Sequence, residues 1–294
     1  MKRLNFFMML FAMLSLAFVG CNKDKTGTLN LSITDAPIDS DGIVGVYITI
    51  NEIQYHLGGG DWETFTDFVG PQTYNLLDLT HGESSLMGNL EMEAGTYTQL
   101  RFILNAPVYG GGTPSNPGCY LVFEDETTKP LFVPSSSVSG FKGVGAFKVP
   151  LNGSVGVTAD FDIRKSVLET GSGMYILKPT IRLIVDNQAG KISGSVIHIP
   201  ADTQIVIYAY EEGNYTETEA NEPEPETPRF PNAVSSDLVD ETGCFHIAFL
   251  APMTYQLVVT ANVDGNFSEV LGIVENVLVE SKKTTSVTID LDNL

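Results

Sequence analysis

Apolar residues recur at every second position through long stretches of this chain of 294 residues. Leu29, Leu31 and Ile33 alternate with polar residues, and the same period returns at residues 44–50. Because successive side chains of a strand point to opposite faces of a sheet, this period is typical of strands with one buried face. No long amphipathic helix pattern interrupts these strands after residue 21. The pattern therefore predicts an all-β fold.

Turn-forming residues divide the strands into two groups. Gly, Pro, Ser and Asn gather between the predicted strands, and the alternation changes parity at residues 51–52, which predicts a bulge or a bend between sheets. At residues 186–190 the pattern resets, and roughly seven more strands follow, as in a small Greek-key sandwich. The sequence predicts two tandem β-sandwich domains, residues 27–186 and 187–294.

The second predicted domain contains one segment of different composition, residues 211–231. It carries seven glutamates, four prolines and one arginine. Low hydrophobicity and like charge oppose packing into a core. We therefore expect an acidic disordered loop.

The N-terminus has the pattern of a secretory signal. Lys2 and Arg3 precede an apolar run at residues 6–19, and Gly20-Cys21 is followed at once by polar residues. The run is shorter than the roughly 20 residues of a membrane-spanning helix, which is one alternative; an ordinary cleaved signal is the other. The junction resembles the lipobox of bacterial lipoproteins, although Phe18 replaces the usual Leu.

This resemblance implies a processed and lipidated chain. Residues 1–20 would be a cleaved signal peptide, and residues 21–26 a tether with Cys21 as the acylated residue and the membrane as its partner. The expected location is the bacterial cell envelope, as an outer membrane lipoprotein. Asp24 close behind Cys21 favours exposure at the cell surface.

Charge and cysteine content set two further limits. The formal net charge of −20 repels phosphate backbones, so we expect no nucleic-acid partner. Cys119 and Cys244 remain besides Cys21, one in each predicted domain. A disulfide between them and two separate thiols are both compatible with an oxidising envelope.

Signatures of enzymes are missing from the sequence. It has no Gly-x-Ser-x-Gly elbow, His-Glu-x-x-His pair, phosphate-binding glycine loop or Cys-x-x-Cys. The histidines, His56, His81, His198 and His246, are far apart in the chain. We predict no catalytic residue.

Two groups of carboxylates are candidates for chemistry. Asp35, Asp39 and Asp41 share one turn and offer the hard oxygens that calcium prefers, but aspartates are also ordinary turn residues; calcium is the one cofactor considered. Asp160 and Asp162 alternate with apolar residues and so face one side of a strand. A pair of carboxylates can serve as acid and base, but a solvated strand face is the favoured interpretation.

Trp62 is the only tryptophan, and it follows a glycine-rich turn with Tyr55 nearby. Such aromatic rings either stack on sugars or cover the open end of a sandwich core. Trp62 and Tyr55 are therefore the candidate ligand-binding residues.

The first predicted domain contains seven distinctive runs of residues. They are Gly27-Thr-Leu-Asn-Leu-Ser-Ile-Thr-Asp-Ala-Pro37, Val46-Tyr-Ile-Thr-Ile-Asn-Glu-Ile53, Tyr74-Asn-Leu-Leu-Asp-Leu79, Ala94-Gly-Thr-Tyr97 with Arg101, Pro134-Ser-Ser, Asp160-Phe-Asp-Ile-Arg-Lys-Ser166 and Tyr175-Ile-Leu-Lys-Pro179. Through these runs, residues 27 to 186 resemble the envelope lipoprotein family called domain of unknown function 4382, whose role is not established.

The second predicted domain contains four further runs, Ile192-Ser-Gly-Ser-Val196, Val206-Ile-Tyr-Ala-Tyr210, Thr242-Gly-Cys-Phe245 and Thr254-Tyr255 with Leu250 before it. Through these runs the domain resembles the carboxypeptidase-regulatory-like, prealbumin-like sandwich, although Met253 stands where that pattern has glycine. The resemblance implies an accessory module with a carbohydrate-binding-like fold.

These expectations converge on an envelope-anchored lipoprotein with a non-catalytic binding, adhesive or structural role. Its partner would be a protein or a glycan met at the loop tips. The alternatives are a carbohydrate-binding surface module, and a hydrolase whose site assembles from scattered Asp, Glu and His residues.

Overall fold

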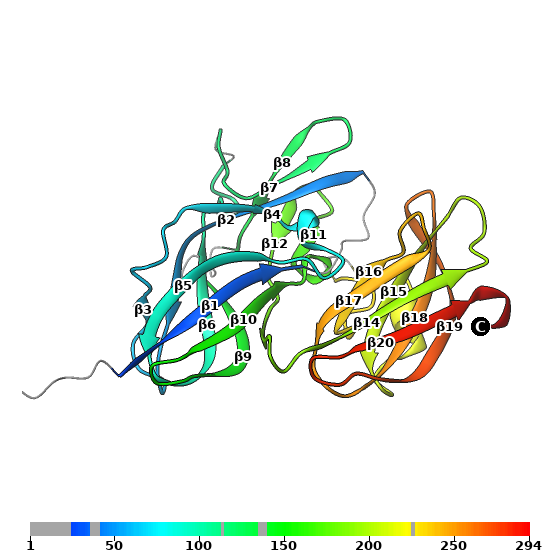
Figure 1. Ribbon diagram of the computed structural model, residues 1–294. Coiled ribbons are helices and arrows are strands. Elements are labelled where there is room, and N and C mark those ends of the chain that lie inside the picture. Colours follow the sequence, from blue (N-terminus) through cyan, green and yellow to red (C-terminus); the bar gives the residue numbers. More distant parts are fainter. Residues whose placement is uncertain (1–24, 36–41, 113–114, 135–139, 225–226) are drawn as a thin grey trace, which may run out of the picture.

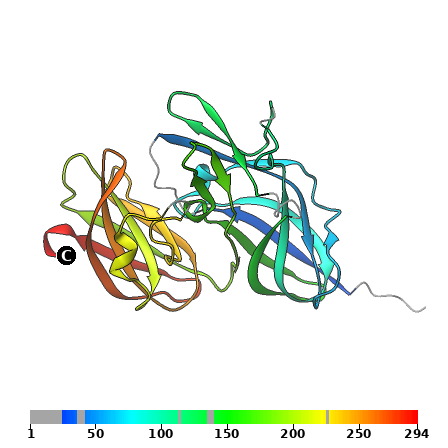
Figure 2. The same cartoon turned by 180° about the vertical axis from the view of Figure 1, so that it is seen from behind.

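The computed structural model describes residues 25–35, 42–112, 115–134, 140–224 and 227–294. The predicted signal peptide and Cys21 lie outside these residues. In the described part of the chain, no helix has both the length and the apolar character needed to cross a membrane. Two β-rich units stand side by side, as both views show (Figure 1 and Figure 2). The prediction of an all-β fold is confirmed.

The first unit is built on a 13-stranded sheet. The order is β11-β12-β8-β7-β2-β6-β9-β13-β10-β1-β5, with β3 and β4 also paired to β2. Its strands are β1 (Thr26–Thr34), β2 (Ile43–Tyr55), β3 (Glu63–Thr64), β4 (Gln72–Asn75), β5 (Ser85–Glu93), β6 (Gly95–Leu104), β7 (Tyr120–Phe123), β8 (Thr128–Phe132), β9 (Phe141–Val149), β10 (Ser154–Phe161), β11 (Val167–Glu169), β12 (Tyr175–Leu177) and β13 (Ile181–Val185). Two short helices accompany them, η2 (Leu76–Leu79) and α2 (Ile163–Ser166).

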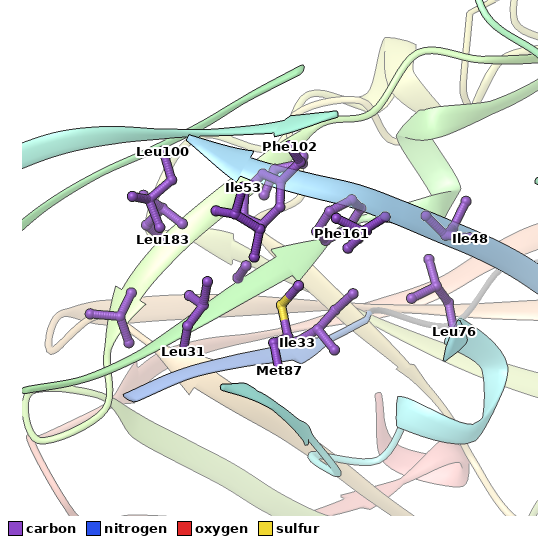
Figure 3. Packing of buried hydrophobic residues seen from close by; sticks show 14 of the residues in the cluster. Leu31, Ile33, Ile48, Ile53, Leu76, Met87, Leu100, Phe102, Phe161 and Leu183 are labelled. Carbon is purple, nitrogen blue, oxygen red and sulfur yellow. The ribbon is translucent and has the colours of Figure 1, made fainter. Parts of the chain in front are cut away.

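The sheet of the first unit folds over on itself and encloses one core. Leu31 on β1 and Ile53 on β2 are completely buried, and side chains from opposite parts of the sheet meet between them (Figure 3). The alternation predicted for β1 is reproduced, because its apolar residues are the buried ones. The predicted bulge is also confirmed, by a shift in the register of β2 against β6 between Ile50 and Glu52.

The second unit is a sandwich of a three-stranded and a four-stranded sheet. The orders are β17-β14-β20 and β16-β15-β18-β19, and a second core lies between the sheets. The strands are β14 (Gly190–Ile197), β15 (Thr203–Glu211), β16 (Ser235–Leu238), β17 (Cys244–Leu250), β18 (Thr254–Val263), β19 (Asn266–Leu278) and β20 (Thr284–Asp290), with short helices η4 (Glu217–Ala220) and η5 (Leu291–Asn293). Residues 186–189 connect the two units. Whether each unit folds alone stays a prediction.

The expectation of a disordered loop at residues 211–231 is wrong for the described residues of this segment. Phe230 is completely buried against Tyr208, with the two ring centroids 4.4 Å apart, and Tyr215 packs against the same small core. The hydroxyl of Tyr210 donates a hydrogen bond of 3.0 Å to Glu219 in η4. Two aromatic rings thus supply apolar contacts that the average composition of the segment concealed.

Candidate functional site

The candidate site lies where the first unit meets the second, and strand β10 leads to it. The Cα of Asp160 on β10 is in register with Thr34 of β1 and with Arg182 of β13. Arg182 donates to Asp160 Oδ2 through both Nε and Nη2. Beyond β10 the chain turns into α2, whose first amide, that of Ile163, donates a 3.0 Å hydrogen bond to Asp35 Oδ1. Neighbouring strands therefore place two carboxylates at the same edge of the first unit.

Helix α2 carries the charges that reach across to the second unit. Arg164 Nη2 lies 2.7 Å from Asp162 Oδ2, and Lys165 Nζ lies 3.5 Å from the same oxygen. The Arg164 guanidinium is also 5.6 Å from the ring centroid of Tyr208, and Lys165 donates a 2.6 Å hydrogen bond to the carbonyl of Ala233. Asp162, Arg164 and Lys165 all belong to the Asp160–Ser166 run, one of the seven runs that carry the family resemblance.

A second charged contact crosses the same junction beside α2. Nδ1 of His81 lies 2.9 Å from Oδ2 of Asp237, which is fully buried on β16. The same oxygen accepts a 2.6 Å hydrogen bond from the amide of His246. Gly82 allows this close approach, because a Cβ there would lie 2.7 Å from the His246 ring and its φ of +80° is unfavourable for other residues.

A small cavity lies inside the junction, with a volume of about 10 Å³. Asp160 and Ser236 line it, and neither Asp160 Oδ1 nor Ser236 Oγ has a hydrogen-bond partner among the described residues. This volume accommodates about one water molecule. It is too small for an organic substrate.

Burial dominates the electrostatics of the junction. Desolvation raises the pKa of Asp160, although Arg182 opposes the change. Desolvation alone would lower the pKa of Arg164, but Asp162 and Tyr208 outweigh it and raise that pKa, so the guanidinium stays charged. Burial lowers the pKa of Lys165, and the hydrogen bond to Asp237 raises the pKa of His81.

The predicted solvated face at Asp160 and Asp162 is wrong. The residues Asp160 and Asp162 are only 3% and 2% exposed. Ser236 and other residues of the second unit line the same small cavity as Asp160, so the second unit lies against this face. Each carboxylate has its own cation, Arg182 or Arg164. Paired and buried carboxylates of this kind do not offer a free acid and base to a substrate.

Two of the four histidines meet at the junction, which their spacing in the sequence did not reveal. His81 and His246 both contact Asp237. His198 lies elsewhere, within 2.6 Å of Asp290 and 3.3 Å of Asp292 in an exposed group that has the composition of a metal site. His56 packs edge-on against Trp62.

The aromatic candidates occupy the hairpin of β2 and β3. The Arg101 guanidinium lies 3.9 Å from the ring centroid of Trp62. Tyr55 packs against Phe65, with centroids 4.4 Å apart, and its hydroxyl donates to Glu63. Binding of sugars by Trp62 and Tyr55 stays a prediction.

The remaining predicted residues divide between those the structure describes and those it does not. Asp39 and Asp41 lie outside the described residues, so calcium binding with Asp35 stays a prediction.

Cys119 and Cys244 are two separate free thiols and do not form the disulfide that the sequence left open as an alternative. Burial raises the pKa of Cys119 to about 12.

Comparisons with known proteins give little functional information. No curated protein matches the chain. Among solved structures, the minor pilin GBS52 of Streptococcus agalactiae is 14% identical, with 89% of this chain and 94% of that chain covered and a TM-score of 0.23. The shaft pilin spaA of Lactobacillus rhamnosus GG is 11% identical, with 90% and 97% covered and a TM-score of 0.23. Similarity this distant defines no shared function.

The family comparison concerns the first unit, which carries most of the junction's charges. The family described as Domain of unknown function (DUF4382) matches residues 26–179, from the start of β1 to the residues just before β13. The matched region includes α2 and both of its cations, the buried Arg164 and the half-buried Lys165. Since the match covers more than half of the residues, the chain belongs to the DUF4382 family.

Proposed function

We propose that this chain is a bacterial envelope lipoprotein, anchored through Cys21, whose two units form one rigid, non-catalytic adhesive or structural module. The observation that carries the proposal is the buried ionic junction around Arg164. Arg164 is paired with Asp162 inside the first unit. Its guanidinium also lies over Tyr208 of the second unit, and the Lys165–Ala233 hydrogen bond and the His81–Asp237 pair cross the same junction, so several polar contacts oppose separation of the units. A rigid spacer on a lipid anchor needs this property.

The chemistry of the junction supports a role without catalysis. Asp160 and Asp162 are each neutralised by a cation, and the cavity beside them has room for about one water molecule. Acid–base catalysis needs a titrating group within reach of a bound substrate. The junction has no room for a substrate beside its carboxylates, and its contacts instead limit movement between the two units.

We further propose that the second unit is a carboxypeptidase-regulatory-like accessory module displayed at the cell surface. Its two sheets of three and four strands have the size of such a sandwich. The carrying run at residues 192–196 lies in β14, between β17 and β20. Loop tips away from the junction would meet a protein or a glycan.

Metabolic labelling tests the anchor. Cells that express the chain are fed an alkyne analogue of palmitate, and we expect label on the wild type and none on Cys21→Ala. Cys244→Ala is the matched control, because it removes the exposed cysteine of the second unit and should keep full labelling. Label that persists on Cys21→Ala would reject the lipoprotein assignment.

Proteolysis tests the display and the rigidity separately. Protease added to intact cells should degrade the protein while a periplasmic marker survives; full protection would reject surface display. For the purified chain, residues 22–294, we expect slow cleavage at residues 186–190 and faster cleavage there in Arg164→Ala. Equal rates in both proteins would contradict the rigid junction.

A further inference from the structure

An open groove runs along the interface of the two units, beside the buried junction. It consists of two adjoining cavities of about 290 and 280 Å³, which share Ala189 of the connecting segment and Phe249 of β17. Ligand sites favour such positions between domains, with volumes of roughly 300–1,000 Å³. The two halves of the groove differ sharply in chemistry.

One half of the groove is basic in a chain whose net charge is −20. Lys191, Lys282 and Lys283 line it, together with one carboxylate, Asp186, which accepts a hydrogen bond from Thr158. Lys283 pairs with Glu280, whereas no ion pair involves Lys191 or Lys282 in the described part of the chain. Two lysines without carboxylate partners are available to an anion.

The backbone fixes these lysines in place. The amide of Lys282 donates a 2.7 Å hydrogen bond to the carbonyl of Ala189, and the amide of Lys191 donates one of 3.1 Å to the carbonyl of Lys283. The Ser281 hydroxyl donates to the carbonyl of Gln188 at 2.9 Å. The turn between β19 and β20 is thereby tied to the connecting segment, so residues about ninety positions apart converge on one cavity.

The other half of the groove is aliphatic. It is lined by Val144 and Ala146 of β9, by Leu183 of β13, and by Ala251 and Pro252, which follow β17. Val144 is 57% exposed and so offers apolar surface to a ligand. Arg182 reaches this half too, but its guanidinium is engaged with Asp160. A sugar would find few hydrogen-bonding partners here, whereas an alkyl chain would gain from burying this surface.

Two residues lining the groove have strained backbones. Phe249 has a φ of +54° and Lys282 a φ of +59°, the left-handed region that bulky side chains seldom adopt. Phe249 lines both cavities and so lies where the two halves meet. Strained residues often gather at ligand sites.

We propose that this groove binds a fatty carboxylate. The carboxylate head is held by Lys191 and Lys282, and the alkyl chain passes Phe249 to lie on Val144, Ala146 and Pro252. Charge complementarity selects the head, and the aliphatic surface selects the tail. This inference is independent of the anchor at Cys21 and of the rigidity of the junction.

Calorimetric titration of residues 22–294 with decanoate, below the concentration at which it forms micelles, tests the proposal. We expect one saturable site. Butanoate, with the same head and a short tail, and decyltrimethylammonium, with the same tail and a cationic head, should each bind at least tenfold more weakly.

Variants place the site. Lys191→Gln with Lys282→Gln should weaken decanoate binding at least tenfold, and so should Val144→Asn, since all three side chains are exposed and their loss spares the fold. Lys25→Gln with Lys129→Gln removes the same charge elsewhere and should bind as the wild type does. No saturable binding, equal binding of the cationic amphiphile, or unchanged affinity in the groove variants would overturn the proposal.

Discussion

The junction cavity and the groove share four lining residues, Gly82, His246, Ala248 and Phe249, but their charged side chains differ in burial and in pairing. In the junction, Asp162 and Arg164 are almost fully buried and lie 2.7 Å apart. In the groove, Lys191 and Lys282 are exposed and have no ion-pair partner among the described residues.

The difference follows from the cost of removing a charge from water. A buried charge without a partner is expensive, so the junction pairs its charges, Asp162 with Arg164 inside the first unit and Asp237 with His81 across to the second. An exposed lysine costs little, so the groove can keep its charges for a ligand. The degree of burial therefore separates charges that serve the fold from charges that serve binding.

The largest expected effect comes from Arg164→Ala, which tests whether buried paired charges contribute more to stability than exposed ones. Removing one partner of a buried pair leaves Asp162 without its nearest cation, and we expect a loss of about 3–5 kcal/mol in the free energy of unfolding. Lys283→Ala, which breaks the exposed pair with Glu280, should cost less than about 1 kcal/mol. Urea unfolding of both variants measures the contrast, and equal losses would show that the junction is not the stronger contact.

Phe230→Ala extends the comparison to the acidic segment at residues 211–231. The ring is fully buried, and its removal should cost about 3 kcal/mol, the lower end for a buried phenylalanine because the surrounding segment is largely exposed. Glu222→Ala, at an exposed position of the same segment, should change stability by less than about 0.5 kcal/mol. Thermal melts compare the two variants. If Phe230→Ala does not change the stability, residues 211–231 do not pack as described and the expectation of a disordered loop would stand.

Much of the fold follows from local sequence pattern. Alternation placed Leu29, Leu31 and Ile33 on one face of β1, and a change of parity located the bulge at residues 51–52. Both are properties of a strand and its nearest neighbours. Composition averaged over twenty residues failed at 211–231, because two aromatic side chains outweigh many exposed glutamates.

The site depends on contacts that local pattern does not contain. Alternation showed that Asp160 and Asp162 share a face but not that the second unit covers it. His81 and Asp237 are 156 positions apart, and their pairing depends on how two separate cores dock. The one local signal is the run at residues 160–166, in which two aspartates and two cations stand close together in the sequence, but it does not identify their partners.

A smaller effect tests the pH dependence of the junction. Asp237 raises the pKa of His81 above 6.5, so the contact stabilises the fold below about pH 6.5 and is lost as the pH rises through the raised pKa. The His81 side chain is 45% exposed, which limits the effect to less than about 1 kcal/mol. His81→Asn should reduce stability at about pH 5.5 and leave it unchanged at about pH 8.5.

Comparing wild type with His81→Asn at each pH isolates this one group. His246 has a pKa lowered by burial and therefore works in the opposite direction, but it is present in both proteins. Glu83, Asp237 and Asp240 also act on this part of the junction, and they too are unchanged by the substitution. A stability difference that grows with pH, or one that does not vary with pH, would contradict a stabilising contact between protonated His81 and Asp237.

The smallest expected effect on stability is that of the double variant Lys191→Gln with Lys282→Gln, which tests whether these lysines serve ligand binding or folding. Replacing Lys191 and Lys282 by glutamine should change the free energy of unfolding by less than about 0.5 kcal/mol, because both side chains are exposed and the hydrogen bonds that fix the turn come from backbone amides. The same variant should lose decanoate binding. Urea unfolding with and without decanoate measures both effects in one experiment, since a ligand that binds only the folded chain raises its stability. If the double variant unfolds much more easily without ligand, the groove lysines support the fold, and the contrast with the junction fails.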